Sequence, residues 1–254
     1  MRVRILGCSG GIGGVLRTTS MLVDGDILID AGTGVGDLSI EEMAAIDHVF
    51  VTHSHLDHIC SIPFLLDTVY GMREKPVTLH ATGATWKIIK EHVFNWKVWP
   101  DFTAIPDEID PFLRFCEIRV GETVHLGGRR ITPLPAHHVV PAVGFQLDSG
   151  AASLVFTGDT TTCDALWPAI NGIENLRYLV IETAFSNAEI GLAQLSGHLC
   201  PSLLLAELQQ LRRPVQVYIT HLKPGESDVI MREIGRDAAA YAPLQLQAPQ
   251  IFEF

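Results

Sequence analysis

The stretch His53-Ser54-His55-Leu56-Asp57-His58 follows directly on the apolar run Val49-Phe50-Val51. It places three of the chain's 11 histidines and a carboxylate within a few positions. A surface turn could be rich in histidine by chance. Three histidines in so short a segment make this explanation less probable than a metal site. Neutral imidazole and carboxylate are ligands that zinc and similar divalent cations prefer. Four donors this close together favour two metal ions over one.

Four apolar runs in the chain end in a histidine or a carboxylate. Continuous apolar runs are typical of strands buried on both faces, and the carboxyl ends of such parallel strands open at one edge of the sheet. We therefore expect the polar residues at these ends to converge. The runs are Val49-Phe50-Val51-Thr52-His53, Leu154-Val155-Phe156-Thr157-Gly158-Asp159, Leu179-Val180-Ile181-Glu182 and Val217-Tyr218-Ile219-Thr220-His221.

The pattern of apolar residues predicts an α/β (α+β) protein in which strands dominate the first half and helices become prominent later. We expect strands over 3–7, 20–23, 26–30, 48–52, 113–120, 123–126, 129–134, 143–147, 153–157, 178–182 and 215–220. We expect helices near 40–46, 84–96, 162–170, 201–211 and 228–240. No low-complexity linker or repeat divides the sequence, so residues 1–254 are interpreted as a single domain of two sheets with helices outside.

Composition limits the classes of partner. A 254-residue chain with 47% hydrophobic residues can bury a substantial core. Its formal charge of −11 disfavours binding to long nucleic acid, which needs a basic face, and favours a small substrate. No apolar stretch has the length of a membrane span or a signal peptide, so we expect no membrane association and a cytoplasmic location. The five scattered cysteines predict neither a disulfide framework nor a thiolate zinc site.

The motif at 53–58, a later histidine, Thr157-Gly158-Asp159 and the late His221 together resemble the metallo-β-lactamase fold superfamily over essentially the whole chain. The resemblance implies an αββα sandwich of two mixed β-sheets with outer helices. It also implies two divalent metal ions, zinc in the first instance, with manganese or iron as alternatives.

The resemblance further implies a set of metal ligands. His53, His55 and a later histidine would hold one metal, Asp57, His58 and His221 would hold the other, and Asp159 would bridge them. The later histidine is either His137 or His138. Related phosphodiesterases have a glycine six residues after this ligand, and Gly144 selects His138. His137 would then point to the opposite face of a strand.

Within the superfamily, Gly197-His198-Leu199-Cys200-Pro201 is similar to a segment of class II cyclic-nucleotide phosphodiesterases. Glu182 and His198 also resemble the acidic motif and distant histidine of transfer-RNA 3′-processing endonucleases. The resemblance implies a dinuclear metal-dependent phosphodiesterase in which Asp57 orients the attacking water and accepts its proton. His198 would protonate the leaving oxygen, and Glu182 would hold the His198 ring.

Several functions stay open from the sequence. The preferred one is hydrolysis of a small cyclic nucleotide such as 3′,5′-cyclic AMP, by a homodimer. The alternatives are a transfer-RNA 3′-end endonuclease, a ribosyl cyclic-phosphate phosphodiesterase, and a non-catalytic metal-bound module that binds a nucleotide or a partner protein. The endonuclease normally carries a basic arm between the later metal histidine and the bridging Asp. Here Asp159 follows His138 by 21 positions with no Lys or Arg between them.

Overall fold

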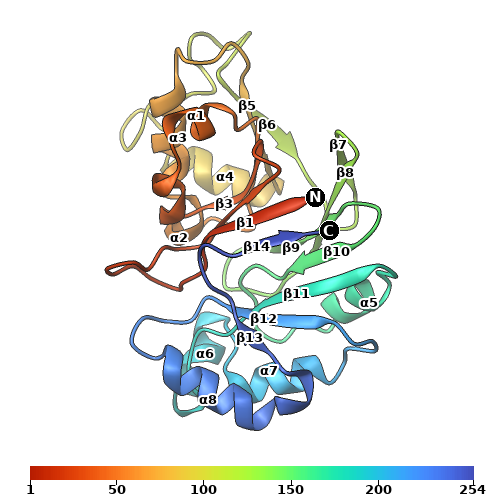
Figure 1. Cartoon of the computed structure of the whole chain (residues 1–254). Helices are drawn as coiled ribbons and strands as arrows, with labels where there is room; N and C mark the ends of the chain where they lie inside the picture. Colours follow the sequence, from red (N-terminus) through yellow and green to blue (C-terminus); the bar gives the residue numbers. More distant parts are fainter.

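Two seven-stranded sheets face each other in the computed structural model, which describes residues 1–254 (Figure 1). The first sheet has the strand order β14-β1-β2-β3-β4-β5-β6. Its strands are β1 (Arg2–Gly7), β2 (Ser20–Val23), β3 (Ile27–Ala31), β4 (His48–Phe50), β5 (Val77–Ala81), β6 (Leu113–Glu117) and β14 (Ile251–Glu253). Because β14 pairs with β1, the two ends of the chain lie side by side.

The second sheet has the order β13-β12-β11-β10-β9-β8-β7. Its strands are β7 (Val124–Leu126), β8 (Arg129–Pro135), β9 (Val143–Asp148), β10 (Ser153–Phe156), β11 (Leu176–Glu182), β12 (Gln216–Thr220) and β13 (Leu244–Gln245). Both sheets contain parallel and antiparallel pairs, as expected.

Helices cover the outer face of each sheet, which confirms the predicted αββα sandwich (Figure 1). The first sheet carries α1 (Ile40–Ala44), α2 (Leu56–Ile59), α3 (Ser61–Val69) and α4 (Gly83–His92). The second carries α5 (Leu166–Asn171), α6 (Ile190–Ser196), α7 (Pro201–Leu208) and α8 (Ser227–Asp237). None of these helices combines the length and the hydrophobicity needed to cross a membrane.

Three groups of buried apolar side chains hold the layers together. One lies between the sheets and includes Ile5, Phe50, Phe145 and Phe156. The other two fill the spaces between each sheet and its own helices. Removing this apolar surface from water stabilises the sandwich, and both faces of the central strands are covered, which explains their continuous apolar sequences.

The parallel strands run in the same direction within each sheet, as the sequence predicts. β3, β4, β5 and β6 are mutually parallel. β10, β11 and β12 are also parallel. The segments that follow β3, β4, β10, β11 and β12 therefore emerge at shared edges, and each of them begins with or soon reaches a polar residue.

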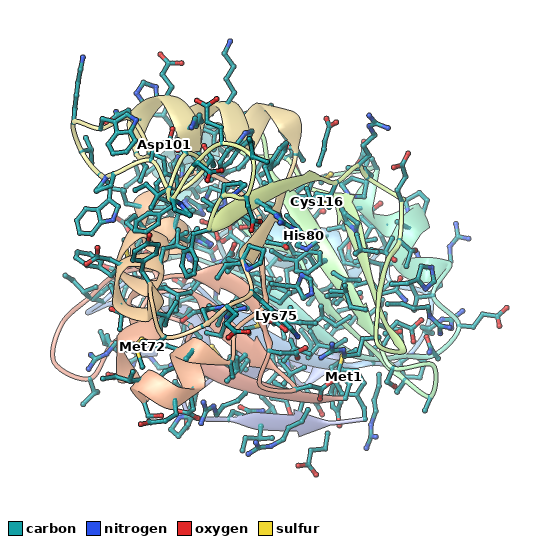
Figure 2. All side chains as sticks on the ribbon, turned by 90° about the horizontal axis from the view of Figure 1, so that it is seen from above. Met1, Met72, Lys75, His80, Asp101 and Cys116 are labelled. Atoms are coloured by element: carbon teal, nitrogen blue, oxygen red, sulfur yellow. The ribbon has the colours of Figure 1, made fainter.

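Some elements differ from the sequence prediction. Several elements are additional, namely the helices Leu56–Ile59, Ser61–Val69 and Ile190–Ser196 and the strands Val77–Ala81, Leu244–Gln245 and Ile251–Glu253. The helix expected over 84–96 ends at His92, and Trp96 beyond it has a left-handed backbone with φ of 62°. The segment after α4 is anchored by Asp101, which accepts hydrogen bonds from Lys90 and from Thr103. Figure 2 shows Asp101 beside α4.

His80 has a structural role in the first sheet. Its ring stacks on Phe50 with centroids 4.1 Å apart, and its Nε2 lies 3.1 Å from Nδ1 of His48. Burial, followed by the proximity of His48, lowers the pKa of His80 to about 4. His80 pairs in register with Cys116 of the edge strand β6, and Figure 2 shows both. His80 is thus a neutral core residue of the first sheet and not part of any group of potential metal ligands.

A buried carboxylate joins α7 to α5, and its removal tests the packing of this layer. Glu207 Oε2 accepts hydrogen bonds from Trp167 Nε1 at 2.7 Å and from the backbone N of Cys163 at 3.1 Å. We expect Glu207→Ala to lower the free energy of unfolding by about 1 to 3 kcal/mol for each donor left unsatisfied. Urea denaturation of both proteins measures the difference. Glu207→Gln keeps an acceptor oxygen, so its free energy of unfolding should fall less than that of Glu207→Ala. Equal stability of the wild type and both variants would contradict this interpretation.

Candidate metal centre

The first group of potential ligands comprises His53, His55 and His138. Each offers a nitrogen, and these three nitrogens lie within 4.8 Å of one another. His53 follows β4 and is fully buried, whereas His138 lies in the loop that follows β8. The Nε2 atom of His138 lies 3.2 Å from Nδ1 of His55. Residues more than 80 positions apart in the chain are thereby brought to one point.

The second group comprises Asp57, His58, Asp159 and His221, whose donor atoms also lie within 4.8 Å of one another. Asp159 follows β10 and is almost completely buried. Its Oδ2 lies 3.3 Å from Nε2 of His58 and 3.7 Å from Nε2 of His53, so this carboxylate adjoins both groups. Its Oδ1 lies 3.4 Å from Nδ1 of His221. The structure thus gathers all seven residues that the sequence predicted as ligands.

The donor atoms fit divalent cations. His53 Nε2, His58 Nε2 and His221 Nδ1 are buried and have no hydrogen-bond partner, which is costly unless another group satisfies them. Burial lowers the pKa of His53, His55, His138 and His221, so these rings are neutral and their lone pairs are available. Burial opposes charge on His58, but Asp159 and Asp30 raise its pKa.

Asp30 supports this centre, although the sequence interpretation gave it no role. It lies in β3, is fully buried and has a left-handed backbone with φ of 56°. Its carboxylate accepts hydrogen bonds from His58 Nδ1 at 2.7 Å and from the backbone N and the Oγ1 of Thr52, both at 2.8 Å. The bond to Nδ1 directs Nε2 of His58 toward Asp159. The feature of the sequence that could have indicated this role is the position of Asp30 near the end of an apolar strand.

Two glycines lie against the rings of His138 and His221. Gly197 ends α6 with φ of 71°, and its carbonyl accepts a hydrogen bond from His138 Nδ1 at 2.9 Å. A Cβ at Gly197 would lie 3.1 Å from that nitrogen. At Gly10 a Cβ would lie 2.5 Å from the carbonyl oxygen of His221 and 3.0 Å from its ring. These two glycines allow the backbone to approach the ligands closely.

His198 and Glu182 form a buried pair beside the two groups. His198 Nδ1 lies 2.7 Å from Glu182 Oε1, which also accepts a hydrogen bond from the backbone N of Thr160. Donor atoms of His198, His138 and Asp159 lie within 4.8 Å of one another. Burial disfavours a charged ring at His198, but the Glu182 carboxylate outweighs it and raises the pKa of His198. Burial raises the pKa of Glu182 as well.

His137 lies apart from these groups. The strand β8 ends at Pro135, so His137 belongs to a loop and not to the strand that the sequence interpretation assumed. Its Nδ1 lies 3.1 Å from the carbonyl oxygen of Thr162. Its neighbour His138 is the one that faces the other histidines.

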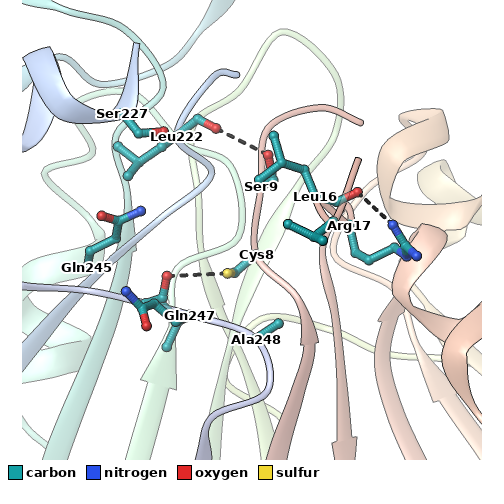
Figure 3. A pocket seen from close by; sticks show the side chains of 11 residues that line it. Cys8, Ser9, Leu16, Arg17, Leu222, Ser227, Gln245, Gln247 and Ala248 are labelled. Carbon is teal, nitrogen blue, oxygen red and sulfur yellow. Dashed lines mark hydrogen bonds between the residues drawn. The ribbon is translucent and has the colours of Figure 1, made fainter. Parts of the chain in front are cut away.

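A cavity of about 300 Å³ lies next to the segment that carries His221 (Figure 3). Its walls include Cys8, Leu222 and Gln245 but none of the seven potential ligands. The Cys8 thiol donates to the carbonyl oxygen of Leu246, and burial raises its pKa to about 11. Cys8 is therefore a protonated structural thiol and not a nucleophile.

Comparison with known proteins identifies the family. The family model described as "Beta-lactamase superfamily domain" matches residues 26–222. The chain therefore belongs to this family, which confirms the resemblance noted in the sequence. Among solved structures, unliganded yeast PDE1 has a TM-score of 0.84 at 18% identity and covers 100% of this chain and 99% of its own. The protein YhfI from Bacillus subtilis has a TM-score of 0.78 at 18% identity and covers 99% of both chains. These structures share the fold.

Curated relatives match this chain over only part of their own length. A probable 3′,5′-cyclic-nucleotide phosphodiesterase of Yersinia pestis is 25% identical over 206 residues, which cover 71% of this chain and 58% of that protein. A ribonuclease Z of Haloarcula marismortui is 33% identical over 156 residues, which cover 58% of this chain and 47% of that protein. The chain thus spans about half the length of these curated relatives.

Replacing Asp30 tests the support of His58. In Asp30→Asn, the amide nitrogen can donate to His58 Nδ1 and favour the wrong tautomer of the ring. We expect zinc affinity to fall by about 10- to 100-fold, as for other residues that hold metal-binding histidines. Competition with a chromophoric chelator measures the affinity. The control is Asp37→Asn, which alters an exposed ion pair with Arg17. Equal affinity in both variants would contradict the role of Asp30.

The neighbouring histidines 137 and 138 form a matched pair for a second test. We expect His138→Ala to lose metal because it removes one of three nitrogens, and His137→Ala to keep it because that ring lies outside the groups. Elemental analysis of chelator-free protein gives the stoichiometry. Retention of full metal content by His138→Ala, or its loss in His137→Ala, would reverse the assignment.

Proposed function

We propose that this chain is a phosphodiester hydrolase that uses two divalent cations and acts on a small cyclic nucleotide of the 3′,5′-cyclic AMP type. The observation that carries the proposal is the buried His198–Glu182 pair, which faces the two ligand groups from the side of the second sheet. Metal ligands alone suit any member of this family. A separate proton donor beside them suits the cleavage of an ester with a poor leaving group.

His53, His55 and His138 would hold one cation, Asp57, His58 and His221 would hold the other, and Asp159 would serve both. Two such cations supply charge neutralisation at the phosphate and make water acidic enough to ionise near neutral pH. Zinc is the proposed metal because its usual ligands match this set of donors.

Asp57 has a second proposed task. Its side chain is 29% exposed, whereas those of His58 and Asp159 are almost fully buried. Its Oδ2 lies 3.8 Å from Nε2 of His58 and 3.7 Å from Nε2 of His221. A carboxylate that is both a ligand and partly open to solvent can orient the attacking water and accept its proton.

His198 would protonate the leaving oxygen. Its Nδ1 is engaged by Glu182, which leaves Nε2 to face a substrate. Glu182 also accepts hydrogen bonds from Thr160 N and Leu199 N, so the carboxylate is fixed before any ligand arrives. This arrangement prepares the ring as a general acid and prevents its rotation away from the site.

Similarity to ribonuclease Z suggests a second candidate function, cleavage of an RNA phosphodiester. Two features support the small substrate instead. The segment between His138 and Asp159, where an RNA-binding arm would be inserted, is occupied by the hairpin of β9 and β10 and contains no Lys or Arg. The formal charge of −11 also opposes the binding of a long polyanion.

The proton donor can be tested separately from the metal ligands. We expect His198→Ala to lower kcat for bis-p-nitrophenyl phosphate less than for cyclic AMP, because p-nitrophenolate leaves without a proton. For cyclic AMP the loss should be about 10²- to 10⁴-fold. Steady-state kinetics of metal-loaded protein measures both values, and elemental analysis verifies that both metals remain.

His137→Ala serves as the control and should match the wild type in both assays. Loss of metal from His198→Ala would show that this ring is a ligand. Absence of cleavage of cyclic AMP, cyclic GMP and a precursor transfer RNA by wild-type protein with two bound metals would favour a non-catalytic binding module.

A further inference from the structure

Lys223 differs from the other half-buried cations of this chain. Arg4, Arg17, Arg73, Lys90, Arg129 and Arg130 each form an ion pair with a carboxylate. Arg213 donates to the carbonyl oxygens of Asn171, Ile173 and Glu174. Lys223 has no ion pair, and its ammonium donates to one acceptor, the carbonyl oxygen of Gly10, at 2.9 Å. Two of its three N–H groups thus have no protein partner.

Two contacts and its position in the sequence place this ammonium near the candidate metal centre. Lys223 follows His221 by two positions. Its Nζ lies 5.9 Å from the ring centroid of Phe185, and that ring lies 5.7 Å from the ring of His198. Gly10, which accepts its hydrogen bond, adjoins the ring of His221. The cation therefore lies between residues that contact His198 on one side and His221 on the other.

The charge environment is consistent with this position. The pKa of His198 is affected first by burial and then by Glu182 and Asp159, and the Lys223 cation also acts on it, in the lowering direction. Glu226, three residues further on, bonds to Lys223 through its backbone N and not through its carboxylate. A partly desolvated ammonium without a carboxylate partner is a suitable binding group for an anionic ligand.

We propose that Lys223 binds a non-bridging phosphate oxygen of the substrate while its ammonium lies over the face of the Phe185 ring. This inference rests on the proposed phosphodiesterase function and adds a residue that selects anionic substrates. The ammonium is held by Gly10 and by the aromatic face of Phe185, so little side-chain entropy is lost when the phosphate binds.

The test separates the charge of Lys223 from its bond to Gly10. Lys223→Gln retains an N–H donor for the Gly10 carbonyl but removes the charge, whereas Lys223→Arg retains the charge. We expect Lys223→Gln to raise KM for bis-p-nitrophenyl phosphate about tenfold, with kcat and metal content unchanged, because a charge-assisted hydrogen bond present in both ground and transition states is lost. Lys223→Arg should recover most of the affinity. The control is Lys97→Met, which removes a positive charge from an exposed residue on the segment after α4.

Binding of inorganic phosphate to the metal-loaded proteins, measured by calorimetry, gives a readout that does not depend on turnover. The dissociation constant should rise about tenfold in Lys223→Gln relative to wild type and Lys97→Met. Equal constants in Lys223→Gln and wild type would overturn the inference even if the wild type is an active phosphodiesterase. A wild type without phosphodiesterase activity that shows the tenfold difference in phosphate binding would overturn the proposed function and keep Lys223 as an anion-binding residue.

Discussion

The candidate metal centre depends on a buried carboxylate, Asp159, surrounded by imidazoles. It lies at the junction of the two sheets, with His53, His58 and His221 within 3.7 Å. Removing a carboxylate from water costs free energy unless it is paired. The ring nitrogens of His53, His58 and His221 that face Asp159 form no hydrogen bond of good geometry with it. Bound cations would offset this cost, since they would pair with the carboxylate and the unpartnered nitrogens at once. The sandwich therefore keeps at its edge an arrangement of polar groups that folding alone does not favour.

The sheets supply the convergence. Strands β4, β10 and β12 are largely buried on both faces. The residues that follow them lie at the carboxyl ends of the parallel strands, where the edges of the two sheets meet. This is why the sequence itself could predict that these polar residues converge: a continuous apolar run that ends in His or Asp is visible locally, and parallel pairing brings such ends together. The αββα sandwich and the division of the ligands between two metals were inferred from the resemblance to a known family. The choice of His138 over His137 needed the resemblance to a known family, because adjacent identical residues carry no local signal that separates them.

The elements and residues that the sequence did not predict have two causes, an unclear apolar period in the elements and a dependence of the residues on contacts distant in the chain. The helix Ser61–Val69 has a nearly continuous apolar sequence with a proline, and the strand Val77–Ala81 is short, so neither shows a clear period. Asp30 and Lys223 acquire their roles from His58 and from Gly10 and Phe185, which lie elsewhere in the sequence. The expected cytoplasmic location and homodimer remain predictions.

The two groups of ligands are expected to hold two cations that share Asp159. Crystals of zinc-loaded protein, measured on both sides of the zinc absorption edge, test it most directly. We expect two anomalous peaks, one contacted by His53, His55 and His138 and the other by Asp57, His58 and His221, with a carboxylate oxygen of Asp159 bound to each. A single peak, or metal bound away from these side chains, would contradict it.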